Sequence, residues 1–154
     1  MCLGNICRSP LAEAIFNDLL RQEELDSRVL CDSAGTSDYH IGKLPDERTL
    51  EVVNQKGLSL EHRARQFTKE DFRSFDYIVA MDESNLFDIK ALATKGNDDK
   101  QQLFLMREFD DTPGDTNVPD PYWGGDRGFF EVHDILLRSC SNLLRFIKSK
   151  QDIQ

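Results

Sequence analysis

The segment Cys2-Leu3-Gly4-Asn5-Ile6-Cys7-Arg8-Ser9-Pro10 joins a short polar loop to the start of a helix. Ser9 can cap free backbone N–H groups and Pro10 is tolerated at a first helical position, while the apolar residues that follow recur at helical spacing up to about Gln22. A turned loop that enters a helix N-terminus offers several N–H groups and a partial positive charge to one point. The segment therefore predicts a site for a phosphate group.

Two reactive side chains flank this loop. Arg8 can hold two phosphoryl oxygens with its planar guanidinium, and Gly4 suits a sharp turn. The same positive field would favour the thiolate of Cys2, which is the nucleophilic form of a cysteine. A cysteine six positions before an arginine is weak evidence on its own. The polar loop between them and the immediate helix start strengthen the prediction of nucleophilic chemistry on phosphorus.

The rest of the chain alternates between short apolar runs and amphipathic stretches. The runs at 29–33, 75–80 and 103–106 predict buried strands. Helices are predicted at 46–56, where Gly57 follows as a C-terminal signal, and at 84–94 and 128–149. The alternation predicts one α/β domain over 1–154, with a parallel sheet of about four strands between helices on both faces.

Several motifs in this order resemble one known family. The loop from Cys2 to Pro10 is similar to the signature loop of the low-molecular-weight protein tyrosine phosphatases. Further similar segments span nearly the whole chain: Asp32-Ser33-Ala34-Gly35-Thr36, Ala64-Arg65-Gln66, Phe75-Asp76-Tyr77-Ile78, Met81-Asp82-Glu83-Ser84-Asn85 and Val118-Pro119-Asp120-Pro121-Tyr122.

The resemblance implies hydrolysis of phosphotyrosine in proteins, and of aryl phosphates, through a phosphocysteine. Cys2 would attack phosphorus, Arg8 would hold the phosphoryl oxygens, and Asp120 would protonate the leaving group and then activate water. The phosphate-binding loop would also comprise Leu3, Gly4, Asn5, Ile6, Cys7 and Ser9, with Ser9 donating to the Cys2 thiolate. Asn5 would brace the loop with support from Ser33 and His62, and the walls of a deep aromatic slot would come from Tyr39, Tyr122 and Trp123, with Leu3 and Ile6.

The family likeness carries two further implications. Cys7 would form a reversible disulfide with an oxidised Cys2 and so protect the nucleophile. A short apolar strand precedes the nucleophile in the family, whereas only Met1 precedes Cys2 here. The resemblance thus implies a start about half a dozen residues too late, and a chain that truly began at Met1 would be expected to fold weakly and show little activity.

Other readings of the same loop remain open. Arsenate reductases of this fold relay a disulfide outward through additional cysteines, but Cys31 falls in a predicted strand and Cys140 on a helix face. Protein-arginine phosphatases are expected to carry a small hydroxyl residue at Ile6. A non-catalytic phosphotyrosine-binding module would have no use for Cys2 and Asp120 together.

The composition of the chain limits the kinds of molecule that we expect it to bind. The net charge of -9 would repel nucleic acid and anionic membranes, and no apolar run is long enough to span a bilayer. The cysteines form no CxxC pair and the histidines lack ligand spacing, so we expect neither a metal ion nor another cofactor. A cytoplasmic monomer acting on phosphotyrosine-containing proteins is predicted.

Overall fold

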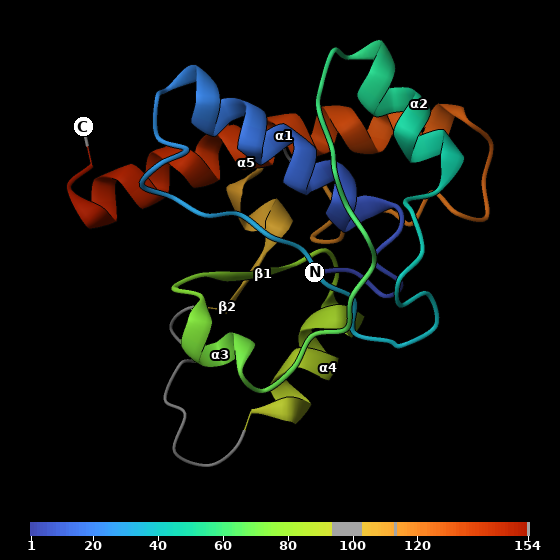
Figure 1. Ribbon diagram of the computed structural model, residues 1–154, viewed down its shortest axis with the longest axis horizontal. Coiled ribbons are helices and arrows are strands. Elements are labelled where there is room, and N and C mark those ends of the chain that lie inside the picture. The colour runs from blue at the N-terminus through green and yellow to red at the C-terminus, as the bar shows by residue number, and fades with distance from the viewer. Residues whose placement is uncertain (94–102, 113, 154) are drawn as a thin grey trace.

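Helices cover both sides of a small parallel sheet (Figure 1). The computed structural model of the protein describes residues 1–93, 103–112 and 114–153. Helices α1 and α5 lie above the sheet in Figure 1, and α3 and α4 lie below it, which confirms the predicted α/β class. The helices and strands are α1 (Arg8–Gln22), α2 (Glu47–Gln55), α3 (Asp71–Ser74), β1 (Ile78–Ala80), α4 (Glu83–Leu92), β2 (Leu103–Leu105), the 3-10 helix η2 (Met106–Phe109) and α5 (Arg127–Gln151).

The sheet is smaller than predicted. Strands β1 and β2 pair in parallel, with Ile78 opposite Leu103. Beyond them, the described residues contribute only isolated parallel bridges, one between Cys2 and Gly35 and one between Gly35 and Gln66. The expected sheet of about four strands is therefore two strands extended by single bridges.

Met1 connects these bridges to β1. Its nitrogen donates to the carbonyl of Val79 at 2.8 Å, and its carbonyl accepts from the amide of Met81 at 2.9 Å. Residues 1 and 2 thus lie between β1 and the segment around Gly35, and Figure 1 shows the N-terminus inside the molecule beside β1. Cys2 is fixed from both sides before the loop begins.

The prediction of a strand at 29–33 is wrong. This segment runs without a ladder partner among the described residues, and Leu30 is 82% exposed despite its apolar side chain. A cavity of about 400 Å³ separates segment 28–34 from segment 74–79, with side chains of α1 and α5 in its wall. An apolar run predicts burial, but a strand also needs a neighbour that exchanges backbone hydrogen bonds with it.

The helix predictions hold where the structure describes them. Helix α1 ends at Gln22 as expected, and α2 begins after Asp46, whose carboxylate accepts from the amide of Arg48 at 2.9 Å. Gly57 adopts a φ of 68° directly after α2, a conformation that favours glycine at a helix end. Helix α4 lies within the predicted 84–94 helix, apart from its first residue, and Thr94 falls outside the described residues. Helix α5 covers 128–149 and slightly more.

The apolar core has two parts, one on each side of the sheet. The larger part joins α1, α2 and α5, and its fully buried members include Leu11, Ile15, Val52 and Leu136. The smaller part packs Phe67, Phe72, Ile78, Ile89 and Leu105 between the sheet, α3 and α4. Each such side chain stabilises the fold by roughly 1.5–3 kcal/mol, so the sheet is held from both faces.

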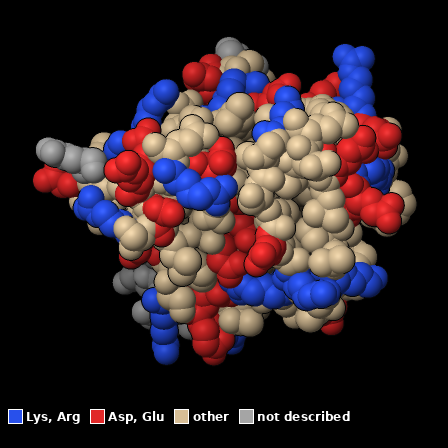
Figure 2. Space-filling view, turned by 45° about the horizontal axis from the view of Figure 1, so that its top comes forward, with Lys and Arg blue, Asp and Glu red and all other residues tan. Residues whose placement is uncertain are grey.

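The surface carries charges of both signs. In the view of Figure 2, acidic and basic side chains are interspersed around an uncharged area. Among the described helices, none is both long and apolar enough to cross a membrane.

Candidate active site

The phosphate loop, residues 2–8, leaves its backbone amides free. Among the described residues, none accepts a hydrogen bond from the amides of Leu3, Gly4, Asn5, Ile6, Cys7 or Arg8. These amides lead directly into the N-terminus of α1, whose first turn contains no acidic side chain. Unpaired amides at a helix N-terminus form a site for an anion. The structure thus gives the loop the donors that phosphate requires.

Close packing fixes the path of the loop. Asn5 has a φ of 56°, which is unusual for a residue other than glycine. A Cβ on Gly35 would lie 2.7 Å from the carbonyl oxygen of Leu3, so only glycine allows segment 34–36 to approach the loop this closely. Thr36 and Ser37 then donate their amides to the carbonyls of Cys2 and Leu3 at 2.9 and 3.0 Å.

Cys2 is buried and faces a hydroxyl. Its Sγ lies 3.0 Å from Oγ of Ser9, which in turn accepts from Nδ2 of Asn5 at 2.8 Å. Ser9 is therefore not the helix cap that the sequence predicts, because the N-cap position falls on Cys7 and no side chain caps α1. Its hydroxyl instead points at the sulfur.

Asn5 connects the loop to two other segments. Besides Ser9, its Nδ2 donates to Oγ of Ser33 at 2.9 Å, and its Oδ1 accepts from the amide of Arg65 at 2.9 Å. Nε2 of His62 lies 3.2 Å from the Asn5 carbonyl. The structure thus brings Asn5, Ser33 and His62 together.

Glu13 completes this network from α1. Its Oε2 accepts from Oγ of Ser33 at 2.6 Å and lies 3.0 Å from Nδ1 of His62. Burial alone would lower the pKa of His62, but the hydrogen bond and charge of Glu13, together with the Asn5 carbonyl, outweigh burial and raise the pKa above its ordinary value. A protonated His62 can donate from both ring nitrogens, which matches its two acceptors.

Arg8 is buried and oriented by acceptors from two segments. Its Nη1 donates to Oδ2 of Asp82 at 2.7 Å and to the carbonyl of Val118 at 2.9 Å. Its Nη2 lies 3.6 Å from Oδ2 of Asp120. The guanidinium therefore stands between the phosphate loop and the predicted acid, with its direction set mainly by Asp82.

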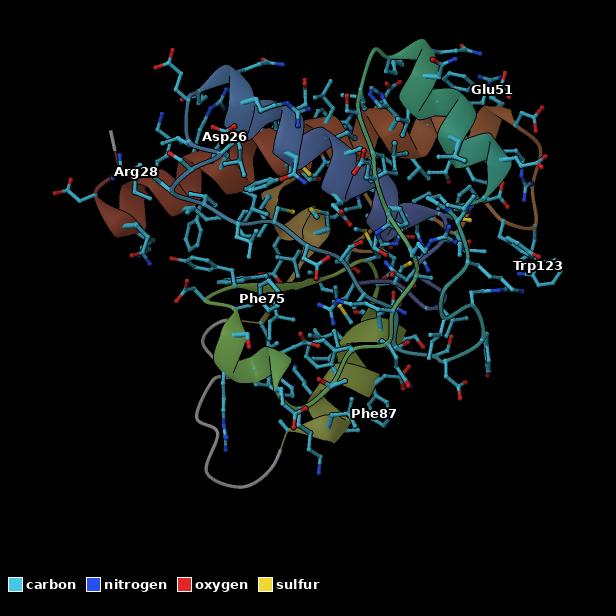
Figure 3. The ribbon with its side chains drawn as sticks, viewed as in Figure 1. Asp26, Arg28, Glu51, Phe75, Phe87 and Trp123 are labelled. Atoms are coloured by element: carbon cyan, nitrogen blue, oxygen red, sulfur yellow. The ribbon has the colours of Figure 1, made fainter. Side chains whose placement is uncertain are left out.

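The acid loop, residues 119–126, is exposed apart from the buried Pro121. The Asp120 side chain is 40% exposed, and its Oδ1 accepts from the amide of Tyr122 at 3.1 Å. The rings of Tyr122 and Trp123 meet edge to face at 4.9 Å, and Trp123 projects outward at the right of Figure 3 with 88% exposure. Tyr39 is exposed as well but comes from the separate segment after Thr36.

Burial governs the ionisation of the other three cysteines. Burial, followed by the charge of Asp46, raises the pKa of Cys7 to about 12. Burial likewise raises the pKa of Cys31 to about 12 and raises that of Cys140. At neutral pH these three side chains are protonated thiols. Within the described part of the chain, no group of three or more His, Cys, Asp or Glu side chains is placed to hold a metal ion.

The sequence prediction missed several residues of this site. Glu13 lies within the apolar pattern of α1, and Asp82 is the N-cap of α4, with Oδ1 accepting from the amide of Asn85 while Oδ2 meets Arg8. A carboxylate inside an apolar stretch is a signal for Glu13, since it needs a partner when buried. For Asp82, its place in a recognised motif was the available signal.

Comparison with known proteins gives one consistent result. The family model for low molecular weight phosphotyrosine protein phosphatase matches residues 1–153. The chain is 42% identical over 144 residues to a protein of that name from Gallus gallus, covering 94% of this chain and 90% of the relative.

Solved structures agree. A protein tyrosine phosphatase from Entamoeba histolytica superimposes with a TM-score of 0.89 at 40% identity, covering 99% of this chain and 96% of that one. A drosophila arginine phosphatase superimposes with a TM-score of 0.88 at 34% identity, covering 96% and 94%. With its motifs, its loop geometry and a match over almost its full length, the chain belongs to the low molecular weight phosphotyrosine protein phosphatase family.

Proposed function

We propose that this phosphatase removes the phosphoryl group from phosphotyrosine through a covalent phosphocysteine on Cys2, with Arg8 and Asp120 as the other catalytic residues. The observation that carries the proposal is that the amides of residues 3–8, which directly follow the buried Cys2, donate to no acceptor among the described residues. Such donors stabilise the charge on the equatorial phosphoryl oxygens, and a reaction on phosphorus gains most of its rate from such positioning.

In the first step the Cys2 thiolate attacks phosphorus in line with the bond to the tyrosine oxygen. The S–P bond forms, the P–O bond breaks, and protonated Asp120 gives its proton to the leaving phenolate, so that tyrosine departs neutral. Arg8 moves its free Nη2 donor toward two phosphoryl oxygens while Asp82 keeps Nη1 in place.

In the second step the Asp120 carboxylate takes a proton from a water molecule whose oxygen attacks phosphorus. The S–P bond breaks, phosphate forms, and the electron pair returns to sulfur as the thiolate. Ser9 supports this leaving thiolate. Because its oxygen already accepts from Asn5, its own hydrogen is directed to Sγ of Cys2 at 3.0 Å.

The residue at the middle of the loop supports an aromatic substrate. Ile6 is half-buried and packs against the main core, so its side chain gives the loop an apolar wall. A drosophila arginine phosphatase has the same fold, but a small hydroxyl residue is expected at this position in enzymes of that class. An apolar wall favours a phenyl ring over a charged guanidinium group.

Trapping the intermediate tests the proposed function. Rapid quenching of the wild-type enzyme with phosphotyrosine peptide should give an acid-labile mass increase of one phosphoryl group on the peptide that contains Cys2. Cys2→Ser should abolish turnover, whereas Cys31→Ala should leave turnover unchanged. Hydrolysis of phosphoserine or phosphoarginine at the rate of phosphotyrosine, or turnover in Cys2→Ser, would contradict the proposal.

We also propose that oxidation of Cys2 is reversible. Peroxide would oxidise the Cys2 sulfur to a sulfenic acid, and the Cys7 sulfur would then attack this sulfur, so that the S–S bond forms, the S–O bond breaks and the hydroxyl leaves as water. Since the pKa of Cys7 is about 12, this displacement should accelerate with rising pH. After peroxide treatment, peptide mapping should find a bridge that thiols reverse, and Cys7→Ser should lose activity permanently. An unreversed sulfinic acid on wild-type Cys2 would refute the proposal.

The same mechanism suggests which partners, location and oligomeric state to expect. We propose phosphotyrosine-containing proteins as partners, and a cytoplasmic monomer as the active form. The net charge of -9 supports the exclusion of nucleic acid as a partner, because phosphate backbones would be repelled.

A further inference from the structure

Arg48 occupies a position that local rules disfavour. It lies in the first turn of α2, where the helix dipole favours acidic side chains and opposes a positive charge. Residues that break a local rule without local gain are candidates for functional roles. The contacts of Arg48 explain why an arginine is present there.

The guanidinium of Arg48 connects α2 to the acid loop. Its Nε and Nη2 donate to the two carboxylate oxygens of Asp46, both at 3.0 Å. Nη2 also donates to the carbonyl of Tyr122 at 3.2 Å, and Nη1 donates to the carbonyl of Gly124 at 3.3 Å. The guanidinium lies over the ring of Phe129 with its central carbon 4.5 Å from the ring centre. The acid loop is thus held at the second and fourth residues after Asp120.

The other end of this connection reaches the phosphate loop. The amide of Asp46 donates to the carbonyl of Ile6 at 2.8 Å, and Oγ1 of Thr49, buried in α2, lies 3.5 Å from the carbonyl of Cys7. A continuous path therefore leads from the loop that carries the nucleophile, through Asp46 and Arg48, to the loop that carries the acid. This path links the backbone that follows Asp120 to the loop that contains Cys2.

Resting on the proposed function, we infer that Arg48 is a positioning residue that places Asp120 for proton transfer to the leaving tyrosine. Its role depends on the planar fork, because one guanidinium makes hydrogen bonds to a carboxylate and to two backbone carbonyls at once. Lysine, with a single ammonium group, cannot replace it. A general acid displaced by about 1 Å loses much of its effect, although nucleophilic attack is unaffected.

A series of aryl phosphates tests the inference. Arg48→Met should lower kcat/KM, which reports the steps up to departure of the leaving group, about 10–100-fold for phenyl phosphate, whose leaving group needs a proton, and less than about threefold for 2,4-dinitrophenyl phosphate, whose leaving group does not. Arg48→Lys should resemble Arg48→Met. The matched control is Arg127→Met, because Arg127 is also near the acid loop but is 92% exposed and pairs only with Glu131 at 3.2 Å among the described residues. That variant should keep the wild-type dependence on the leaving group.

A second experiment combines Arg48→Met with Asp120→Asn. In the Asp120→Asn background, Arg48→Met should add less than about twofold, since there is no acid left to place. If Arg48→Met lowered kcat/KM equally for all leaving groups, or by the same factor with and without Asp120, the positioning role of Arg48 would be refuted. The proposed role of Asp120 would then still stand. If Asp120→Asn itself left the leaving-group dependence unchanged, the proposed acid would be wrong and the inference would fall with it. Activity on 2,4-dinitrophenyl phosphate and thermal melting both report whether each variant is folded.

Discussion

The phosphate loop and the acid loop meet at Arg8 but are stabilised in different ways. The phosphate loop is buried and braced through Asn5 by hydrogen bonds to three segments, and it packs against Gly35 without free space. The acid loop is exposed apart from Pro121, and among the described residues Arg48 holds the backbone of Tyr122 and Gly124 while Arg8 lies near Asp120. In the proposed mechanism, the loop that positions the nucleophile is thus built into the core, and the loop that would admit a substrate and a water molecule lies at the surface.

The largest effect expected from this contrast is on catalysis through the acid loop. Asp120→Asn should lower kcat for phosphotyrosine by about 10²–10⁴-fold, because the leaving group then departs without a proton. The free energy of unfolding should change by less than about 0.5 kcal/mol, since the side chain is 40% exposed and an asparagine oxygen can still accept from the Tyr122 amide. Steady-state kinetics and urea unfolding on the same sample measure both quantities.

A neighbouring carboxylate provides the control for that prediction. Asp126 precedes α5 in the same loop, is exposed, and makes no capping hydrogen bond with its side chain. Asp126→Asn should therefore leave kcat within about twofold of the wild type. A large loss of stability in Asp120→Asn would contradict the division between the two loops.

The next effect falls on stability, in the phosphate loop. Asn5→Ala removes the partner of Ser9, Ser33 and the amide of Arg65 at a fully buried position. We expect the free energy of unfolding to fall by roughly 2–4 kcal/mol, because buried polar groups lose their hydrogen bonds. Asn54→Ala on the exposed face of α2 is the control and should be nearly neutral. A stable Asn5→Ala enzyme with normal kcat would show that the network does not brace the loop.

Substitution of one glycine in or beside each loop compares how tightly the two loops are packed. A Cβ on Gly35 would meet the Leu3 carbonyl at 2.7 Å, whereas a Cβ on Gly125 in the acid loop would meet no atom within 4 Å. Gly35→Ala should therefore destabilise the fold by about 1–3 kcal/mol and lower kcat, while Gly125→Ala should change stability by less than about 0.5 kcal/mol. Thermal melting measures both changes. Equal melting temperatures for Gly35→Ala and Gly125→Ala would mean that segment 34–36 shifts to accommodate the added methyl group without a loss of stability.

The contrast also explains what the sequence could predict. Helical spacing located α1, α2, α4 and α5, and Gly57 marked the end of α2, because these signals are local in the sequence. The loop of Cys2 and Arg8 was recognisable for the same reason.

Contacts between distant segments were not predictable in this way. Asp82 meets Arg8 across 74 positions, and Arg48 meets Tyr122 across the same separation. The strand expected at 29–33 failed likewise, since its apolar pattern is local but a ladder partner is not. Sequence patterns thus led to a hypothesis for the chemistry of the site, whereas contacts that orient Arg8 and the acid loop were visible only in the fold.

The smallest expected effect is a pH dependence of stability in the network behind the phosphate loop. Glu13 and the Asn5 carbonyl raise the pKa of His62 in the folded state, so protonated His62 stabilises the fold. This contribution is complete below the unfolded pKa of about 6.5 and is lost as pH rises through the higher folded pKa.

A double-mutant cycle with His62→Gln and Glu13→Gln isolates that contribution. The coupling free energy between the two side chains, on the order of 1 kcal/mol at about pH 6, should shrink as the pH is raised through the folded-state pKa of His62, because the imidazolium then loses its proton. Alkaline loss of stability from other groups appears equally in all four proteins and cancels in the cycle. A coupling that grew with pH would mean that His62 is neutral in the folded protein, and that Glu13 orients Ser33 without help from an imidazolium.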